Sequence, residues 1–213
     1  MSADRRREQL VTGLRQQGIT DERVLAAIAN VPREVFVEEA FADQAYANQA
    51  LPISCGQTIS QPYIVALMTE ALKIEPFHRA LEIGTGSGYQ CAVLSKMCRH
   101  VYTVERYRTL ADIAHERFVA AGLTNITQRV GDGNEGFPDH APFERIMVTA
   151  AAHEIPEVLC SQLSLGGIMV FPLEERSGKQ DLWRLRRHSR GFEREHLLPV
   201  RFVPLVRGMP DEG

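Results

Sequence analysis

A strand, a glycine-rich turn and a helix follow one another in the middle of the chain and constrain its fold most strongly. The run 79–83 reads as a short apolar strand, and the run 88–98 reads as a helix. Gly84, Gly86 and Gly88 stand at alternate positions between them. Glycine permits a tight turn and lets a ligand approach the backbone, and the helix start offers free N–H groups and positive potential. This segment predicts a ligand site at the carboxyl edge of a parallel sheet.

The alternation of strand and helix continues toward the end of the chain. Further strands are predicted at 100–105, 126–130, 143–149 and 168–172, and further helices at 110–121 and 155–163. Two antiparallel strands, 180–187 and 196–203, are expected to follow, joined by a turn at 189–191. Short connections between alternating elements predict an α/β protein with a mainly parallel, doubly wound, Rossmann-like sheet. The antiparallel hairpin would lie at one edge of this sheet.

The first part of the chain predicts an N-terminal helical extension with one long loop. Helices are expected over 4–30, 33–41 and 61–73. Residues 42–60 show little periodicity, and a structureless loop of that length inside a compact unit is usually functional. We expect a single domain over 1–213, in which 1–78 supplies helices and the active-site loop and 79–213 forms the ligand-binding core.

Composition narrows the class of protein. The 213 residues are 44% hydrophobic and 24% charged, which is the balance of a globular protein with a substantial core. A formal net charge of −3 argues against a protein that coats nucleic acid through phosphate contacts. No run approaches the roughly 18 apolar residues of a membrane span, and the N-terminus lacks the apolar stretch of a secretory signal. The cysteines form no C-x-x-C pair and the histidines no paired ligand spacing, so we expect a cytoplasmic protein without a metal.

Acidic side chains stand at the carboxyl ends of the predicted strands, at the same edge as the glycines. They are Glu82, Glu105 and Asp132. A carboxylate at Glu105 can accept hydrogen bonds from two ribose hydroxyls, and one at Asp132 can accept an exocyclic amino group from adenine. The third glycine of a dinucleotide fingerprint would stand at Tyr89, so this turn favours another nucleotide-like ligand. The alternative is a purely structural turn with Glu105 exposed to solvent.

Several further runs of residues occur in a recognisable order over nearly the whole chain. They are Pro32-Arg33-Glu34 with Phe36-Val37, Gly56-Gln57-Thr58-Ile59-Ser60-Gln61-Pro62-Tyr63, Leu81 to Gln90, Tyr102-Thr103-Val104-Glu105-Arg106, Gly131-Asp132-Gly133, Ala141-Pro142-Phe143, Thr149-Ala150-Ala151-Ala152 and Val200-Arg201-Phe202-Val203-Pro204-Leu205. In these runs the chain resembles the protein-L-isoaspartate O-methyltransferases. The resemblance implies the Rossmann-like fold of S-adenosylmethionine-dependent methyltransferases.

The resemblance also implies a reaction. The family transfers a methyl group from S-adenosylmethionine to the free α-carboxyl of L-isoaspartyl residues in damaged proteins and peptides, leaving S-adenosylhomocysteine. The ester then closes to a succinimide without enzyme and reopens partly to normal aspartate, which is repair. A carboxylate, with a reference pKa of about 4, is already ionised at pH 7, so the chemistry requires neither a general base nor a metal. We expect a monomer with damaged proteins as partners and with no nucleic-acid or membrane partner.

The site residues are expected from the same resemblance together with the strand-end pattern. Ser60 is the expected active-site hydroxyl, and the loop 42–60 would close over both substrates. The expected cofactor-binding residues are Thr58, Ile59, Glu82, Gly84, Thr85, Gly86, Ser87, Gly88, Glu105, Asp132 and Gly133. An ordinary alternative for Ser60 is the N-cap of the helix that begins near Gln61.

Departures from the family pattern leave the acceptor open. Ser54 and Glu174 stand where glycine is usual in the family, and Asn134 stands where an aromatic residue is common. A relative that methylates another peptide carboxyl, such as normal aspartate, and a noncatalytic module that keeps the cofactor both remain alternatives. A nucleic-acid amino-methyltransferase would carry an N/D-P-P-Y/F/W run after the fourth strand, where this chain has 149–153 with the sequence TAAAH.

Arginines gather on the predicted edge hairpin. They are Arg184, Arg186, Arg187, Arg190 and Arg194. We interpret them as the exposed face of an edge hairpin, with contact to a peptide or a nucleic acid as the alternative.

Overall fold

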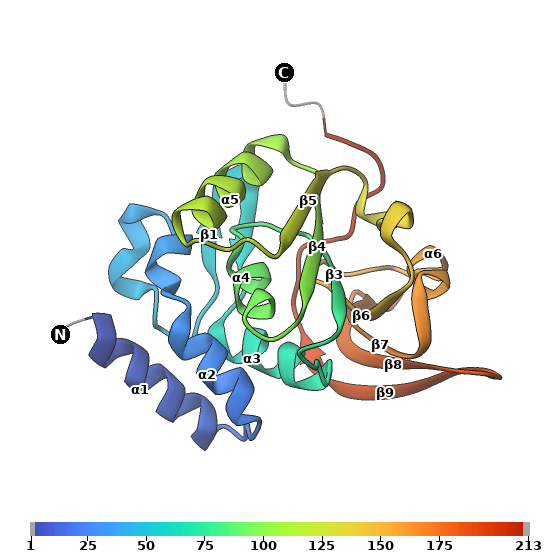
Figure 1. The fold of residues 1–213 in the computed structure, drawn as a ribbon, viewed down its shortest axis with the longest axis horizontal. Coiled ribbons are helices and arrows are strands. Elements are labelled where there is room, and N and C mark those ends of the chain that lie inside the picture. The colour runs from blue at the N-terminus through green and yellow to red at the C-terminus, as the bar shows by residue number, and fades with distance from the viewer. Residues whose placement is uncertain (1–2, 211–213) are drawn as a thin grey trace.

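A central sheet organises the computed structural model, which describes residues 3–210. Its strands are β3 (Arg79–Ile83), β4 (His100–Glu105), β5 (Ile126–Val130), β6 (Phe143–Val148), β7 (Leu163–Glu174), β8 (Gln180–His188) and β9 (Gly191–Val200). Their order across the sheet is β5-β4-β3-β6-β7-β8-β9 (Figure 1). The pairs from β5 to β7 are parallel, and β8 and β9 add an antiparallel edge. The α/β fold with an edge hairpin is confirmed.

The sheet changes direction at β3. From β3 the chain adds β4 and β5 on one side and then returns to add β6 and β7 on the other. Ile83 at the end of β3 pairs with Val104 on one side and Val148 on the other, so these strand ends lie together. Such a reversal opens a crevice outside the carboxyl ends of the strands, the usual ligand position in an open α/β sheet.

Helices cover both faces of the sheet. They are α1 (Ala3–Gln16), α2 (Glu22–Asn30), α3 (Pro62–Ala71), α4 (Tyr89–Ser95), α5 (Arg108–Ala120) and α6 (Glu157–Ser161). Side chains alternate between the faces along a strand, so Val170 of β7 joins the core with α1 to α5, whereas Phe171 joins the core with α6. Figure 1 shows α1 and α2 at one end of the molecule and the β8–β9 hairpin projecting at the other.

The segment 42–60 is partly ordered, and the prediction that it lacks structure was wrong. Its ordered elements include β1 (Leu51–Ile53), the 3₁₀ turn η3 (Ser54–Gly56) and β2 (Gln57–Ile59). Leu51 and Ile59 are paired across this hairpin and both are buried. Cys55 and Gly56 have φ angles of 58° and 64°, which reverse the chain tightly. Strands this short show no readable alternation, so the packing of Leu51 and Ile59 orders the hairpin.

The predicted helix at 33–41 is instead a pair of 3₁₀ helices. They are η1 (Arg33–Phe36) and η2 (Glu39–Gln44). The apolar residues Val35, Phe36 and Val37 are consecutive, so they cannot form the continuous stripe of an α-helix. Phe36 and Arg33 are fully buried while Val35 is 43% exposed, which agrees with a short turn that buries its first and last side chains.

Two strands begin earlier than the pattern predicts. β7 starts at Leu163, so the predicted helix 155–163 ends at Ser161 and the glycines at 166–167 lie inside the strand. The register with β6 shifts in this stretch, and glycines that resemble a helix end also suit a β-bulge. β9 also starts earlier than predicted, at Gly191. Its first half is exposed and charged, so the sequence shows no apolar alternation from which this part of the strand could be predicted.

Candidate functional site

A cavity lies at the carboxyl edge of the sheet where β3, β4 and β6 end. Its walls come from β2, the glycine-rich turn, the end of β4 and the chain after β9. The sequence-predicted residues in its lining are Thr58, Ile59, Ser60, Gly84, Thr85, Gly86, Ser87, Glu105 and Gly133. The structure therefore brings together most of the predicted site, and it leaves Glu82, Gly88 and Asp132 outside the lining.

The glycines of the turn have separate structural roles. Gly84 has φ +92°, and a Cβ there would stand 2.4 Å from Thr149 Oγ1. The Thr149 hydroxyl donates to the carbonyl oxygen of Gly84 at 2.8 Å, so this close approach holds β3 and β6 together. Gly88 has φ +87°, and a Cβ there would stand 2.8 Å from the Phe118 ring. Gly88 thus lets α4 start against α5 without itself reaching the cavity.

Glu105, the carboxylate that is predicted to bind the ribose, lies in the lining of the first cavity. It ends β4 and is only 4% exposed. Oε2 accepts the Gly86 N–H at 2.8 Å, and Oε1 accepts the Tyr107 N–H at 3.0 Å. Burial raises the pKa of Glu105, while these N–H donors oppose the rise. A carboxylate oxygen has two lone pairs, so Glu105 can hold the turn and accept further donors from a ligand.

Glu82 lies behind the turn, where it is fully buried. Its Oε2 accepts the Thr103 hydroxyl at 2.6 Å, and Thr103 Oγ1 is 2.7 Å from Thr85 Oγ1. Burial raises the pKa of Glu82 to about 8. The carboxyl is therefore largely neutral at pH 7, and it supports Thr85 of the turn through a chain of hydroxyl groups.

Asp132 also supports the site from outside the lining of the first cavity. Its Oδ1 accepts the Asn134 N–H at 2.8 Å, and its Oδ2 accepts the Gly208 N–H at 2.7 Å. Burial raises the pKa of Asp132, but the N–H donors from Gly208 and Asn134 outweigh it and lower the pKa overall. The side chain caps the short 3₁₀ turn η4 (Gly133–Glu135) and anchors the chain near its C-terminal end. The adjacent residue, Gly133, is the one that reaches the cavity.

Ser60 lies between β2 and α3, in the cavity wall. The N-cap of α3 is Gln61, and no side chain makes a capping hydrogen bond there. The interpretation of Ser60 as an ordinary N-cap is therefore wrong. Its carbonyl oxygen accepts a hydrogen bond from Arg33 Nη2 at 2.7 Å.

A second cavity adjoins the first at Ser60. The two share Thr58, Ser60, Thr149 and Val203 in their linings. The second cavity continues along residues of α3 and of the chain after β8: Gln61, Ile64, Leu198, Pro199, Val200, Arg201 and Phe202, with Ala50 beside them. Ser60 thus stands where the two cavities meet.

The C-terminal segment 203–206 closes the first cavity, although no site residue was predicted within it. Ala151 N donates to the Val203 carbonyl at 2.8 Å, and Leu205 N donates to the Ala151 carbonyl at 2.7 Å. The sequence feature that could have indicated this role is the apolar run Val203-Pro204-Leu205-Val206 after the last strand. The other lining residues not singled out as site residues are Gln57, Val65, Met68, Ile83, Tyr89, Gln90, Val104, Arg106, Tyr107, Thr149 and Ala150.

The residues that depart from the family pattern lie outside both linings. Ser54 Oγ is 3.4 Å from Glu38 Oε1, and Glu174 accepts a hydrogen bond from Gln180 Nε2 at 2.7 Å. Asn134 Nδ2 donates to Asp132 Oδ1 at 2.8 Å. Each of these residues has a polar partner of its own and belongs to neither cavity lining.

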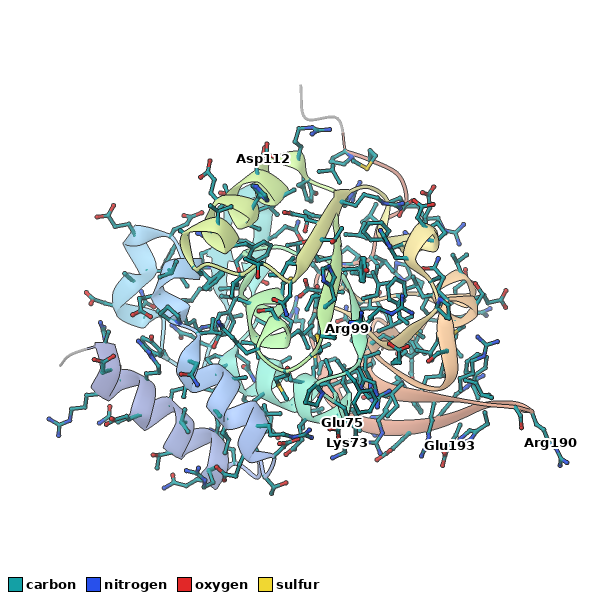
Figure 2. The ribbon with its side chains drawn as sticks, viewed as in Figure 1. Lys73, Glu75, Arg99, Asp112, Arg190 and Glu193 are labelled. Atoms are coloured by element: carbon teal, nitrogen blue, oxygen red, sulfur yellow. The ribbon has the colours of Figure 1, made fainter. Side chains whose placement is uncertain are left out.

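The tip of the arginine-bearing hairpin contributes to neither cavity lining. Figure 2 shows Arg190 at its outer tip and Glu193 along the same hairpin. Arg184 forms an ion pair with Glu195, and Arg187 donates to the Leu163 carbonyl. These contacts match the interpretation of an exposed edge. Within residues 3–210, no three His, Cys, Asp or Glu side chains gather where they could hold a metal ion, and no helix is long and apolar enough to cross a membrane.

Comparison with known proteins identifies the family. A model of the family described as Protein-L-isoaspartate(D-aspartate) O-methyltransferase (PCMT) matches residues 5–209. The chain belongs to this family. The PCMT relative of Parvibaculum lavamentivorans, a protein-L-isoaspartate O-methyltransferase, is 54% identical over 207 residues, covering 96% of this chain and 93% of its own. That of Rhodospirillum rubrum is 54% identical over 212 residues, covering 99% of this chain and 97% of its own.

Solved PCMT structures share the fold. A protein-L-isoaspartate O-methyltransferase superposes with a TM-score of 0.86 at 29% identity, over 93% of this chain and 65% of that chain. A Plasmodium falciparum protein described as PCMT, in complex with S-adenosyl-L-homocysteine, gives a TM-score of 0.82 at 26% identity, over 94% of this chain and 98% of that chain.

Proposed function

We propose that this PCMT-family protein transfers the methyl group of S-adenosylmethionine to the free α-carboxyl group of L-isoaspartyl residues in damaged proteins and peptides. The observation that carries the proposal is the position of Ser60 at the junction of two cavities. The first cavity contains the glycine-rich turn and Glu105, which suit a nucleoside. The second extends from Ser60 along the end of the edge strand β9, which suits a peptide. Methyl transfer requires the donor and the acceptor to meet, and in this proposal they meet beside Ser60.

The residues of the first cavity fit the proposed cofactor. The Glu105 carboxylate can accept ribose hydroxyls, and the apolar side chains of Ile83, Val104 and Leu205 can enclose a purine ring. Gly84 and Gly86 leave the backbone open to a close approach. When bound, S-adenosylmethionine would supply an activated methyl group. In this proposal Thr58, Ile59, Thr85, Ser87 and Gly133 complete the binding surface, while Glu82, Gly88 and Asp132 hold that surface from behind.

Ser60 would act on the acceptor carboxylate. That carboxylate has a reference pKa of about 4 and needs no base at pH 7. A hydroxyl donates a hydrogen bond without the full positive charge that would reduce the reactivity of the oxygen. The apolar wall residues Ile59, Val65 and Met68 limit the water that competes for the charged groups. The remaining task of the protein is alignment of the reacting atoms.

We also propose that the protein acts as a cytoplasmic monomer built as one domain over 1–213. The N-terminal helices and the sheet contribute to the same core, which supports one domain. Among the described residues, Cys55, Cys91, Cys98 and Cys160 form no disulfide, as is usual in a reducing compartment. Light scattering of the purified protein would test the monomer.

A repair assay tests the proposed function. An L-isoaspartyl peptide is incubated with the protein and S-adenosylmethionine, and the products are separated by chromatography. The proposal predicts a methyl ester, then a succinimide and a growing amount of the normal aspartyl peptide. If normal aspartate is the acceptor instead, the normal aspartyl peptide should be consumed. Cofactor binding without either reaction would indicate a noncatalytic module.

A further inference from the structure

Arg33 is buried behind the wall that carries Ser60. Its side chain is 0% exposed. Nε donates to the carbonyl oxygen of Ala45 at 2.8 Å, and Nη2 donates to the carbonyl oxygen of Ser60 at 2.7 Å. One guanidinium therefore joins η1, the segment after η2 and the residue between β2 and α3. Because its donors form a rigid planar fork, arginine can fix the spacing of two carbonyls, whereas lysine has a single ammonium head.

The same guanidinium contacts the residue that follows the glycine-rich turn. Arg33 Cζ lies 4.7 Å from the centroid of the Tyr89 ring. Phe36, from the same 3₁₀ helix, packs edge-on against that ring with centroids 5.6 Å apart. Tyr89 is the first residue of α4, directly after Gly88, and it lines the first cavity. A continuous set of contacts thus runs from the turn through Tyr89 and Arg33 to Ser60.

The burial of Arg33 is costly. Among the described residues, no ion pair includes it. Burial lowers the pKa of Arg33, and the neighbouring Tyr89 opposes that change. Burying a charge carries a desolvation penalty, and Arg33 offsets it with two hydrogen bonds to carbonyls and no carboxylate partner. A role in stability alone therefore explains this arginine poorly.

We propose that Arg33 is a positioning residue that fixes Ser60 relative to the glycine-rich turn. It lines neither cavity, so it acts on the reaction through Ser60 and Tyr89. This inference rests on the proposed function, in which the acceptor is held at Ser60 and the cofactor at the turn. Turnover should be sensitive to Arg33 because a displacement of about 1 Å between reacting groups can cost on the order of 100-fold in rate.

Two substitutions separate positioning from stability. Arg33→Lys keeps the charge but loses the fork, and Arg33→Met removes the charge while filling the space. Both should lower kcat at least about 30-fold while the KM for cofactor and for isoaspartyl peptide changes less than about 3-fold. Arg33→Met removes an unpaired buried charge but leaves the carbonyls of Ala45 and Ser60 without their donor, so kcat should fall in both variants whatever the change in melting temperature.

Arg145→Lys is the matched control. Arg145 is also buried and donates from Nε and Nη2 to a backbone carbonyl, that of Lys73, at 3.0 and 2.8 Å. It lies on β6 and lines neither cavity. We expect Arg145→Lys to reduce stability as Arg33→Lys does and to leave kcat unchanged.

Hydrogen exchange gives a readout that does not require turnover. Arg33→Lys should speed exchange of the amides in 57–63 and leave β3 and β4 unchanged, whereas Arg145→Lys should not affect 57–63. The inference is overturned if Arg33→Lys and Arg33→Met keep wild-type kcat, or if Arg145→Lys lowers kcat equally. A wild-type protein that is inactive on the isoaspartyl peptide would refute the proposed function instead, and the exchange data would still report whether Arg33 orders 57–63.

Discussion

The carboxylate of Glu105 accepts a hydrogen bond from the backbone N–H of Gly86 at 2.8 Å. This bond ties the end of β4 to the middle of the glycine-rich turn. The side chain proposed to bind the ribose therefore also shapes the turn that receives the rest of the cofactor. A change at Glu105 should affect cofactor binding through both roles.

Glu105→Gln should weaken binding of S-adenosylhomocysteine. The amide keeps the size of the side chain but loses the charge, and a hydrogen bond to a charged group contributes about 1.5–3 kcal/mol, or roughly 10- to 150-fold in Kd. Isothermal titration calorimetry measures the change. Asp112→Asn on α5, labelled in Figure 2, is the control and should bind as the wild type does. Equal affinity for Glu105→Gln and the control would contradict the placement of the ribose.

Gly84→Ala should destabilise the protein more than Gly18→Ala. Both glycines have positive φ, +92° and +99°, so both substitutions carry a backbone cost of about 1–2 kcal/mol. Only at Gly84 would the Cβ meet Thr149 Oγ1, at 2.4 Å, which adds about 1–3 kcal/mol. Urea unfolding compares the two variants. Equal losses of stability would show that the contact with Thr149 relaxes freely.

Ser60→Ala should lower kcat with little effect on stability. The lost hydrogen bond to a charged acceptor contributes about 1.5–3 kcal/mol, so kcat should fall roughly 10- to 150-fold. Because Gln61 rather than Ser60 caps α3, the free energy of unfolding should change by less than about 0.5 kcal/mol. Ser161→Ala, at the end of α6, is the control for kcat. Wild-type kcat with a reduced melting temperature would instead assign Ser60 a structural role.

Glu82 should make stability depend on pH. Its pKa is raised from 4.5 to about 8 by burial, so between these values the native state holds a proton that the unfolded state releases. The free energy of unfolding should therefore fall as pH rises through this range, by up to about 1.4 kcal/mol per pH unit. Glu82→Gln keeps a neutral side chain, and its stability relative to wild type should increase from about pH 5 to about pH 8. Parallel stability curves would contradict the buried, protonated carboxyl.

The central strands could be predicted from the sequence. β3, β4 and β5 occupy the predicted residues. β3 and β4 are largely buried and read as short apolar runs bounded by turns, whereas β5 is a half-buried edge strand. The hairpin β1–β2 and the segment 203–206 could not be predicted in this way. Each is too short for a periodic pattern. The buried side chains of the hairpin join the core, and Pro204 forms a bridge with Ala151, so contacts with distant parts of the chain order both of them.

The site could be predicted in position but not in detail. The strand-end rule identified the correct edge and the side chain of Glu105. The rule does not say which way each side chain points. Successive residues of a strand face opposite sides of the sheet, and the Glu82 side chain is buried behind the turn. Asp132 follows β5, the edge strand on the β4 side of β3, and its side chain accepts the Gly208 N–H instead of lining the cavity.

Initial rates of methyl transfer to two matched peptides test the central claim most directly. The peptides share one sequence, with L-isoaspartate in one and normal L-aspartate in the other, and labelled S-adenosylmethionine reports the transfer. The structure and the family predict transfer to the isoaspartyl peptide and none above background to its twin. Transfer to the normal aspartyl peptide, or to neither peptide while S-adenosylhomocysteine still binds, would contradict the account.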